Sequence, residues 1–226
     1  MADPVGTENA FNIVVIGGMN PKIHIPPWYR HVGLINEEEM NHALEKPVVA
    51  INPEGMVFFV HLSDITIACR EFRWEIRTTD LSKISRTKEI ASKVFDEYLI
   101  HTPISQLGFN FIFTQSTSKK NSSYTLAKSV SSMPLGLPSD ALLSGEFILT
   151  QLDSGRRIQT GVTPLNDNKI QIAINFEYAF EPPLENPNKI INFRLGDIIE
   201  KRHTPDMGEA TTIRDRITQS FNQSRE

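Results

Sequence analysis

Cysteine is nearly absent: Cys69 is the single one among 226 residues, so the chain cannot form an internal disulfide. This usage is typical of a reducing compartment. No apolar run approaches the roughly 20 residues that a membrane-spanning helix requires. The N-terminal MADPVGTEN has neither the basic start nor the apolar stretch of a signal peptide. We therefore expect a cytoplasmic protein that makes no contact with a membrane.

Positive charge is in deficit. The chain has 23 Lys and Arg against 27 Asp and Glu, a net charge of −4 with pI near 5.9. No global positive field attracts nucleic acid or anionic lipid, which argues against nucleic-acid binding without excluding a local basic patch. The hydrophobic content of 39% is that of an ordinary globular protein, long enough to bury a core.

Catalytic and phosphate-binding motifs are absent as well. GxGxxG, GxxxxGK[ST] and GxSxG do not occur, and Gly17-Gly18 is followed by prolines at 21, 26 and 27 that prevent a helix from starting at once. The six histidines lack the tight spacing of zinc ligands. Cys69 ends an apolar strand face, so we expect a buried, inert thiol. The sequence predicts no catalytic residue, no metal site and no cofactor.

What the sequence does contain is alternation. In FRWEIRT, Trp74 and Ile76 alternate with Arg73, Glu75 and Arg77, which predicts a strand with one buried face. The preceding ITIAC predicts its hairpin partner. Further strands are expected at 12–16, 107–115, 145–152, 156–162 and 169–180, the last with Ile and aromatic residues on one face. Residues 57–60 belong either to the same strand as Ile65 or to a separate one.

Helical spacing appears in four places. An amphipathic helix of about five turns is expected at 82–99, capped by Asp80, and a shorter one starts at the glutamates 37–39. Parts of 190–202 and all of 211–221 are expected to be helical. The Ser-, Lys-, Gly- and Pro-rich segment 116–144 predicts an exposed, mobile insertion.

These elements predict an α+β protein of a single domain, 1–226, with two pseudo-halves at 11–101 and 105–222. Each half is strands followed by a helix. We expect two antiparallel-sheet-plus-helix halves that form one curved sheet covered by helices on one face. The edge strands of such a sheet favour self-association.

One surface stands out as a binding candidate. The stretch after the first strand is interpreted as an extended, proline-stiffened loop. Trp28 either docks on a partner or folds back on the core, and the second is favoured because large aromatics are usually buried. The predicted binding residues are Lys22, His24, Trp28, Tyr29, Arg30, His31, Arg73 and Arg77, and Lys46 and Trp74 are further members of the basic aromatic patch that they suggest.

The stretch FNIVVIGGMNPKIHIPPWYRHVGLINEEE, the segment RWEIRTTD before the helix at 82–99, and HTPISQLGFNF together resemble a scattered group of bacterial proteins of unassigned function. The resemblance implies a bacterial cytoplasmic protein and brings no active-site residues with it.

We expect a non-enzymatic protein-binding or assembly module with a protein partner or self-association. One alternative is a small-ligand-binding protein or enzyme with a pocket between sheet and helices, for which Arg73, Glu75, Asn110 and Glu177 are the polar candidates. Another is an accessory component of a defence or toxin–antitoxin system that contacts nucleic acid.

Overall fold

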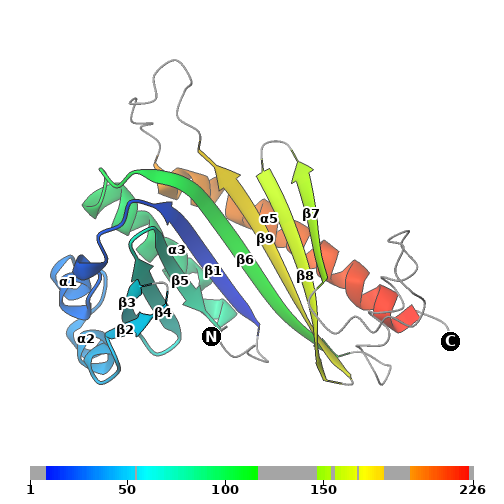
Figure 1. Cartoon of the computed structure of the whole chain (residues 1–226), viewed down its shortest axis with the longest axis horizontal. Coiled ribbons are helices and arrows are strands. Elements are labelled where there is room, and N and C mark those ends of the chain that lie inside the picture. The colour runs from blue at the N-terminus through cyan, green and yellow to red at the C-terminus, as the bar shows by residue number, and fades with distance from the viewer. Residues whose placement is uncertain are drawn as a thin grey trace, which may run out of the picture.

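The computed structural model describes residues 9–53, 55–116, 147–153, 156–166, 168–180 and 194–223. Its strands form one antiparallel sheet of nine strands in the order β2-β3-β4-β5-β1-β6-β9-β8-β7 (Figure 1). The strands are β1 (Ala10–Gly17), β2 (Val49–Asn52), β3 (Gly55–His61), β4 (Ile65–Arg70), β5 (Arg73–Thr78), β6 (Ile104–Ser116), β7 (Phe147–Asp153), β8 (Arg156–Asn166) and β9 (Lys169–Ala179). The predicted α+β class is confirmed.

Two helices lie behind this sheet in the view of Figure 1: α3 (Ile84–Lys93) and α5 (Leu195–Gln223). They contact each other, α3 lies against β1 and β5, and α5 lies against β6 and β9. Two shorter helices, α1 (Pro26–His31) and α2 (Glu37–Leu44), lie near β3. None of the helices in the described part of the chain is both long and apolar enough to cross a membrane.

The hydrophobic core lies between the sheet and these helices. Every second residue of the central strands is buried there, including Phe11, Ile13 and Val15 of β1 and the alternating Phe and Ile rows of β6 and β9. Burying each such side chain contributes roughly 1.5–3 kcal/mol. The alternation that the sequence shows therefore marks one face of the sheet as the core face, as predicted. We call the opposite side of the sheet the open face.

The two halves of the chain follow the same order. β1 to β5 are followed by α3, and β6 to β9 are followed by α5. The halves meet where β1 pairs with β6 in antiparallel register, with Asn12 opposite Asn110. The predicted pseudo-halves correspond to this order of elements, and both contribute to one sheet. The number of domains stays a prediction.

The stretch after β1 corrects the sequence-based interpretation. It is not an extended loop, because Pro21–Ile23 form a 3-10 turn (η1) and Pro26–His31 form α1. Proline is well tolerated in the first turn of a helix, where its missing N–H would have no partner. Gly17 ends β1 as expected: a Cβ there would lie 2.0 Å from the Pro103 carbonyl oxygen.

The C-terminal helix also differs from expectation, because one helix, α5, replaces two separate segments and has Pro205 inside it. Side chains on both sides of the proline, those of His203 and Asp206, are buried and hold the helix against the sheet. The predicted helix at 82–99 is present as a 3-10 turn (η2, Leu81–Lys83) capped by Asp80, then α3, then a π-helical turn (η3, Val94–Tyr98). The predicted insertion 116–144, apart from Ser116, lies outside the described residues.

Candidate functional site

The predicted basic aromatic patch is divided between the two faces of the sheet. Tyr29 of α1 lies on the core face, where its Oη accepts a hydrogen bond from Trp74 Nε1 at 3.1 Å. Arg73 and Arg77 alternate with Trp74 along β5, so their side chains lie on the open face. The expectation that these arginines join the aromatic residues of 22–31 in one patch is therefore wrong.

Two of the predicted patch residues belong to the core. Tyr29 and His24 are 0% and 1% exposed, and His24 Nδ1 lies 2.9 Å from Tyr29 Oη. Burial lowers the pKa of His24 to about 4 and raises the pKa of Tyr29. Neither residue presents a surface for a partner, which corrects the prediction for both.

The remaining patch residues are more accessible. Trp28 is half-buried and packs edge-to-face on Tyr29 and Tyr98, which favours the interpretation that it folds back onto the core. Lys22, Arg30 and His31 are exposed. A binding role for these exposed residues stays a prediction.

The open face carries a different collection of side chains. They are mostly polar or small, and in Figure 1 the ribbons of α3 and α5 lie on the other side of the sheet. From β3 to β8 they are Val57, Phe59 and His61; Thr66, Ala68 and Arg70; Arg73, Glu75 and Arg77; Asn12, Val14 and Ile16; Gln106, Gly108, Asn110, Ile112 and Thr114; Lys169, Gln171, Ala173, Asn175, Glu177 and Ala179; Arg157, Gln159, Gly161 and Thr163.

A row of amides crosses the centre of this face. Strand register places Asn12 opposite Asn110, Asn110 opposite Asn175, and Asn175 opposite Gln159. On the other side Asn12 is opposite Arg77. We call the four amide residues Asn12, Asn110, Asn175 and Gln159 the amide row. It spans three strand spacings, which amounts to about 14 Å, and Arg77 borders it on β5.

The amide row is not internally satisfied. Asn175 Nδ2 donates to Gln159 Oε1 at 3.5 Å. Three buried atoms, Asn12 Oδ1, Asn175 Oδ1 and Arg77 Nε, have no hydrogen-bond partner among the described residues. Each buried polar group of this kind costs about 1–3 kcal/mol. A face selected only for stability would carry apolar or β-branched side chains here.

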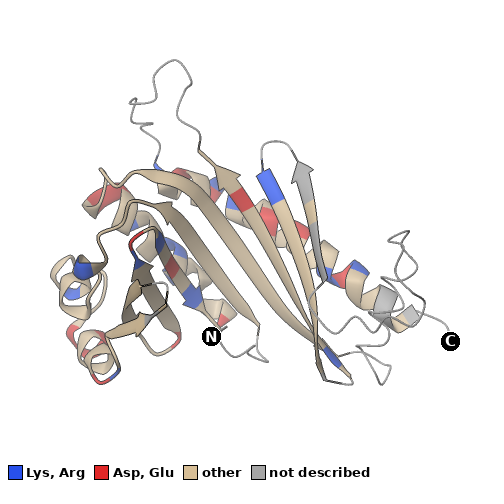
Figure 2. Ribbon diagram, viewed as in Figure 1, with Lys and Arg blue, Asp and Glu red and all other residues tan. Residues whose placement is uncertain are grey.

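Charge on the open face flanks a neutral centre. β1 and β6 carry no charged residue, and Figure 2 shows both strands tan along their length. The charged side chains that the other described strands place on this face are five cations and two carboxylates: Arg70, Arg73, Arg77, Arg157 and Lys169, with Glu75 and Glu177. The strands of the open face are thus positive in a chain whose total charge is −4.

Two of these cations pair with the carboxylates. Arg73 Nη2 donates to Glu75 Oε2 at 2.7 Å along β5, and Arg157 donates to Glu177 across the β8–β9 pair. Both pairs are partly exposed, so water screens them and they contribute little to stability. These hydrogen bonds orient the guanidinium groups of Arg73 and Arg157 on the open face.

Glu75, Glu177, Asn110 and Arg73 are also the polar candidates that the sequence suggested for a pocket between sheet and helices. The structure brings them to one face, but it is the open face and not the helix-covered one. The prediction that these four residues line a pocket between the sheet and the helices is therefore wrong.

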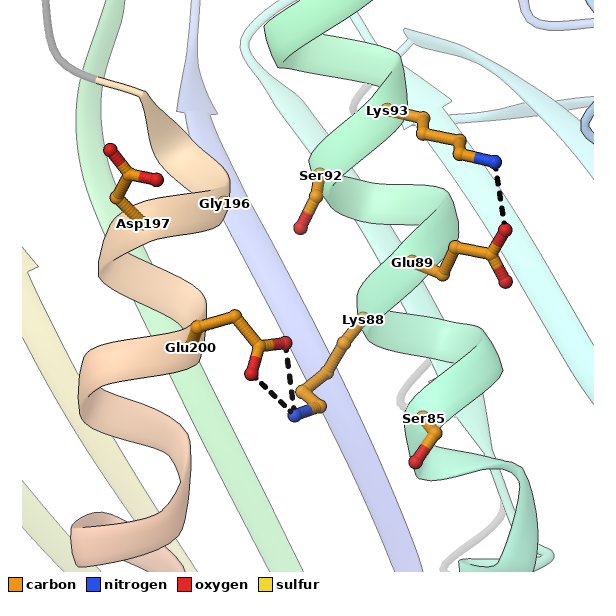
Figure 3. Close-up of a pocket in the computed structure, with 8 residues that line it drawn as sticks. All are labelled: Ser85, Lys88, Glu89, Ser92, Lys93, Gly196, Asp197 and Glu200. Carbon is orange, nitrogen blue, oxygen red and sulfur yellow. Dashed lines mark hydrogen bonds and ion pairs between the residues drawn. The ribbon is translucent and has the colours of Figure 1, made fainter.

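A groove of about 500 Å³ between α3 and α5 is the next candidate (Figure 3). Four of its five charged side chains, all except Asp197, are paired within the groove: Lys88 Nζ lies 3.1 Å from Glu200 Oε1, and Lys93 Nζ lies 2.8 Å from Glu89 Oε1. Asp96 Oδ1 accepts the Leu195 amide at 2.7 Å, so the N-terminus of α5 is already capped. This groove serves the contact between the two helices.

A smaller cavity of about 370 Å³ lies beside Gly18 and the end of η3. Its wall includes His24, Tyr98 and His101 but no carboxylate, serine or cysteine. A general base needs a nucleophile or acid within hydrogen-bond reach. His24 Nδ1 is already engaged by Tyr29 Oη, and among the described residues no hydrogen bond joins Tyr98, His101 and Thr102.

A buried polar cluster joins α5 to the sheet. Tyr178 Oη donates to Asp206 Oδ2 at 2.7 Å, and Arg156 Nη1 donates to Asp206 Oδ1 at 2.7 Å. Burial raises the pKa of Asp206, and it raises that of Tyr178 to about 12. These groups satisfy one another and hold α5 in position. Among the described residues no group of three or more His, Cys, Asp or Glu could hold a metal ion.

No protein-family model matches this chain, and no curated protein matches it either. Kinship with the bacterial group that the sequence resembles stays a prediction. The amide row, Asn12, Asn175 and Gln159 above all, was missed at the sequence level. The available signal was that each amide alternates with core residues, so all three share the face opposite the Phe and Ile rows.

Proposed function

We propose that the chain is a non-enzymatic binding module that holds nucleic acid on the open face. The observation that carries this proposal is the uncharged amide row with arginines on both sides of it. Amide side chains offer both donors and acceptors to base edges and sugars, and arginines bind phosphates. This is the nucleic-acid alternative that the sequence leaves open, and we assign it to the open face.

The distribution of charge supports the proposal. Phosphate contacts supply most non-specific affinity, so a positive working face is more informative than the total charge. Several residues on this face, among them Ala68, Gly108 and Gly161, have a small side chain or none, and no cavity with a described lining is formed by them. A broad ligand fits such a surface better than a small molecule, which needs a concave pocket.

The test is fluorescence anisotropy with labelled single- and double-stranded RNA and DNA over a range of salt. The double variant Arg73→Gln/Arg157→Gln removes two cations from the open face. We expect at least a tenfold loss of affinity and a salt slope lower by about two. Lys22→Gln/Arg30→Gln is the matched control, because it removes the same charge from exposed residues of the 22–31 segment. We expect it to change affinity less than twofold.

Absence of binding to all four nucleic acids, or an equal loss in the control, would overturn the proposal. Melting of each variant, followed by circular dichroism, separates loss of binding from loss of folding.

A second candidate function keeps the expected assembly role, with a second copy of this chain as the partner. β2 is the terminal strand of the sheet, and its neighbourhood exposes Ile51 at 82%, Met56 at 46% and Val49 at 41%. An antiparallel edge strand is complementary to itself across a twofold axis, so two copies of β2 can extend one sheet into another.

Light scattering over a concentration series tests this assembly role. We expect a dimer for the native chain and a monomer for Ile51→Lys, with Ile100→Lys as the control because Ile100 is also exposed, at 56%. A monomeric native chain at every concentration would contradict it.

We also propose that the protein works in the cytoplasm of a bacterium. The support is the single cysteine, which is buried and whose pKa burial raises to about 12, together with the resemblance of the sequence.

A further inference from the structure

We propose that the nucleic acid on the open face is an A-form duplex, double-stranded RNA, whose wide minor groove lies against the amide row. This inference rests on the proposed function and names the ligand for it. Four features of the open face favour it over single strands and over B-form DNA.

The first feature is symmetry. Asn12 and Asn110 are directly opposed in an antiparallel pair, so a local twofold axis passes between them, normal to the sheet. On either side of this axis the opposed residues continue to Arg77 in one half and to Asn175 in the other. The two antiparallel strands of a duplex are also related by twofold axes normal to the helix, whereas a single strand has no such axis. Dimeric proteins that bind duplex sites align their own twofold axis with that of the duplex.

The second feature is the absence of stacking platforms. Sheets that bind single strands place aromatic side chains under successive bases, each worth about 1–3 kcal/mol. Here the described residues of the central strands β1, β6 and β9 carry no aromatic side chain on the open face. Phe59 and His61 do stack on each other on this face, with ring centroids 5.3 Å apart, but they lie on β3, near the margin.

The third feature is reach. Asn side chains are short, and their neighbours on this face include Gly108, Ala173 and Gly161, which have a small side chain or none. The minor groove of B-DNA is about 6 Å wide and about 7.5 Å deep, so a sheet face cannot place such amides on its floor without opening it. The minor groove of A-form RNA is wide and shallow and displays 2′-hydroxyls and base edges within reach of short side chains.

The fourth feature is chemistry. A 2′-hydroxyl both donates and accepts, and the amides of Asn12, Asn110 and Asn175 do the same. The cations lie on β4, β5, β8 and β9, away from the neutral centre, where the phosphates that border the groove would pass. The arrangement is therefore complementary to the whole width of the groove. The amides would contact sugars and bases in its centre, and the arginines would contact the phosphates along its borders.

The experiment compares three probes of one sequence, about 20 base pairs long so that they exceed the ~16 that a double-stranded RNA-binding domain spans. These are double-stranded RNA, the B-form DNA duplex and the single RNA strand. We expect the double-stranded RNA to bind at least tenfold more tightly than the other two. A duplex of 2′-O-methyl RNA keeps the A-form but blocks the hydroxyl donors, and we expect it to lose at least fivefold in affinity with the native protein.

The matched variants are Asn110→Ala and Thr163→Ala, both on the open face, with only Asn110 in the amide row. We expect Asn110→Ala to reduce the preference for RNA duplex over DNA duplex and Thr163→Ala to leave it unchanged. Equal or tighter binding of single-stranded RNA or of the DNA duplex would overturn this inference and leave the proposed function standing. No binding of any probe would overturn both. An unchanged affinity for the 2′-O-methyl duplex would exclude the hydroxyl contacts, and with them this inference, even if the variants failed to fold.

Discussion

Asn12 and Asn110 face each other across the central strand pair of a nine-stranded sheet, on the side opposite α3 and α5. Central strands are normally the best place for β-branched and aromatic side chains. Here the buried Oδ1 of Asn12 has no hydrogen-bond partner among the described residues. Natural sequences carry such locally unfavourable residues most often where they serve function.

Replacing Asn12 by valine separates the two roles. Asn12→Val removes a buried acceptor that lacks a partner and adds a β-branched side chain, so we expect about 1 kcal/mol of added stability, or about 2–4 °C in Tm. Nucleic-acid affinity should fall in the same variant. Calorimetry and anisotropy measure the two effects, and Thr163→Val, outside the amide row, is the control for both. A lower Tm for Asn12→Val would refute the account of this residue.

The hydroxyl of Tyr29 links α1 to the sheet. Tyr29→Phe leaves the buried Trp74 N–H without its acceptor, so we expect a loss of about 1–3 kcal/mol in the free energy of unfolding. Urea denaturation followed by tryptophan fluorescence measures it. Tyr98→Phe, at a residue 39% exposed, is the matched control and should change stability by less than about 0.5 kcal/mol. Equal effects in the two variants would show that the hydrogen bond contributes nothing.

Acid should destabilise the fold through His203. Both of its ring nitrogens are buried without a partner among the described residues, and its ring packs edge-on against Phe11 and Phe109. Burial first, and then Lys88, lower the pKa of His203 to about 4, with Glu200 acting in the opposite direction. The unfolded chain takes up a proton below pH 6.5 and the folded chain does not until about 4, so stability is lost as pH falls through this window.

The loss from one such histidine has a slope of at most about 1.4 kcal/mol per pH unit. Burial also lowers the pKa of His24 to about 4, so His24 contributes to the same loss of stability. The His203→Phe variant should therefore show a smaller dependence of stability on pH, but not none. Urea denaturation at several pH values between 4 and 7 gives the slopes. His31→Phe, at an exposed histidine, should leave the slope unchanged. An identical slope in His203→Phe and the native chain would contradict this origin.

Two glycines should respond in opposite directions to the same substitution. In Gly17→Ala the new Cβ meets the Pro103 carbonyl oxygen at 2.0 Å, so the backbone must move and stability should fall by about 2 kcal/mol or more. In Gly208→Ala the new Cβ meets nothing within 4 Å on α5, so stability should rise by about 0.5–1 kcal/mol. Thermal melting of both variants decides it, and a loss at Gly208 as large as that at Gly17 would contradict the steric explanation.

Much of the fold follows from the sequence because its strands keep a strict period of two. The order FNFIF in β6 is sufficient to place Phe109 and Phe111 in the core and Asn110 on the other side. The sequence predicts an extended loop at 26–31, whereas the segment forms α1. Pro26 and Pro27 are unfavourable inside a helix, which suggests a loop, but they are well tolerated in its first turn. The sequence predicts separate helical segments within 190–202 and at 211–221, but one helix runs through Pro205. The contacts that hold α5 come from residues far away in the sequence, such as Tyr178.

The site was harder to predict than the fold. An alternating pattern identifies which residues share a face within one strand, but only the pairing of strands aligns Asn12, Asn110 and Asn175. The aromatic residues near Trp28 suggest a binding surface in the sequence because large side chains dominate known interfaces. Their partner proved to be the protein's own core, where Tyr29 is fully buried.

The position of β1 between β5 and β6 has a consequence for how the chain folds. β1 is made first, yet its second neighbour does not begin until Ile104, after the whole first half has been synthesised. Until then one backbone edge of β1 stays unpaired beside an apolar face. Contacts between residues so distant in sequence form slowly, and an unfilled edge of this kind invites pairing with another nascent chain.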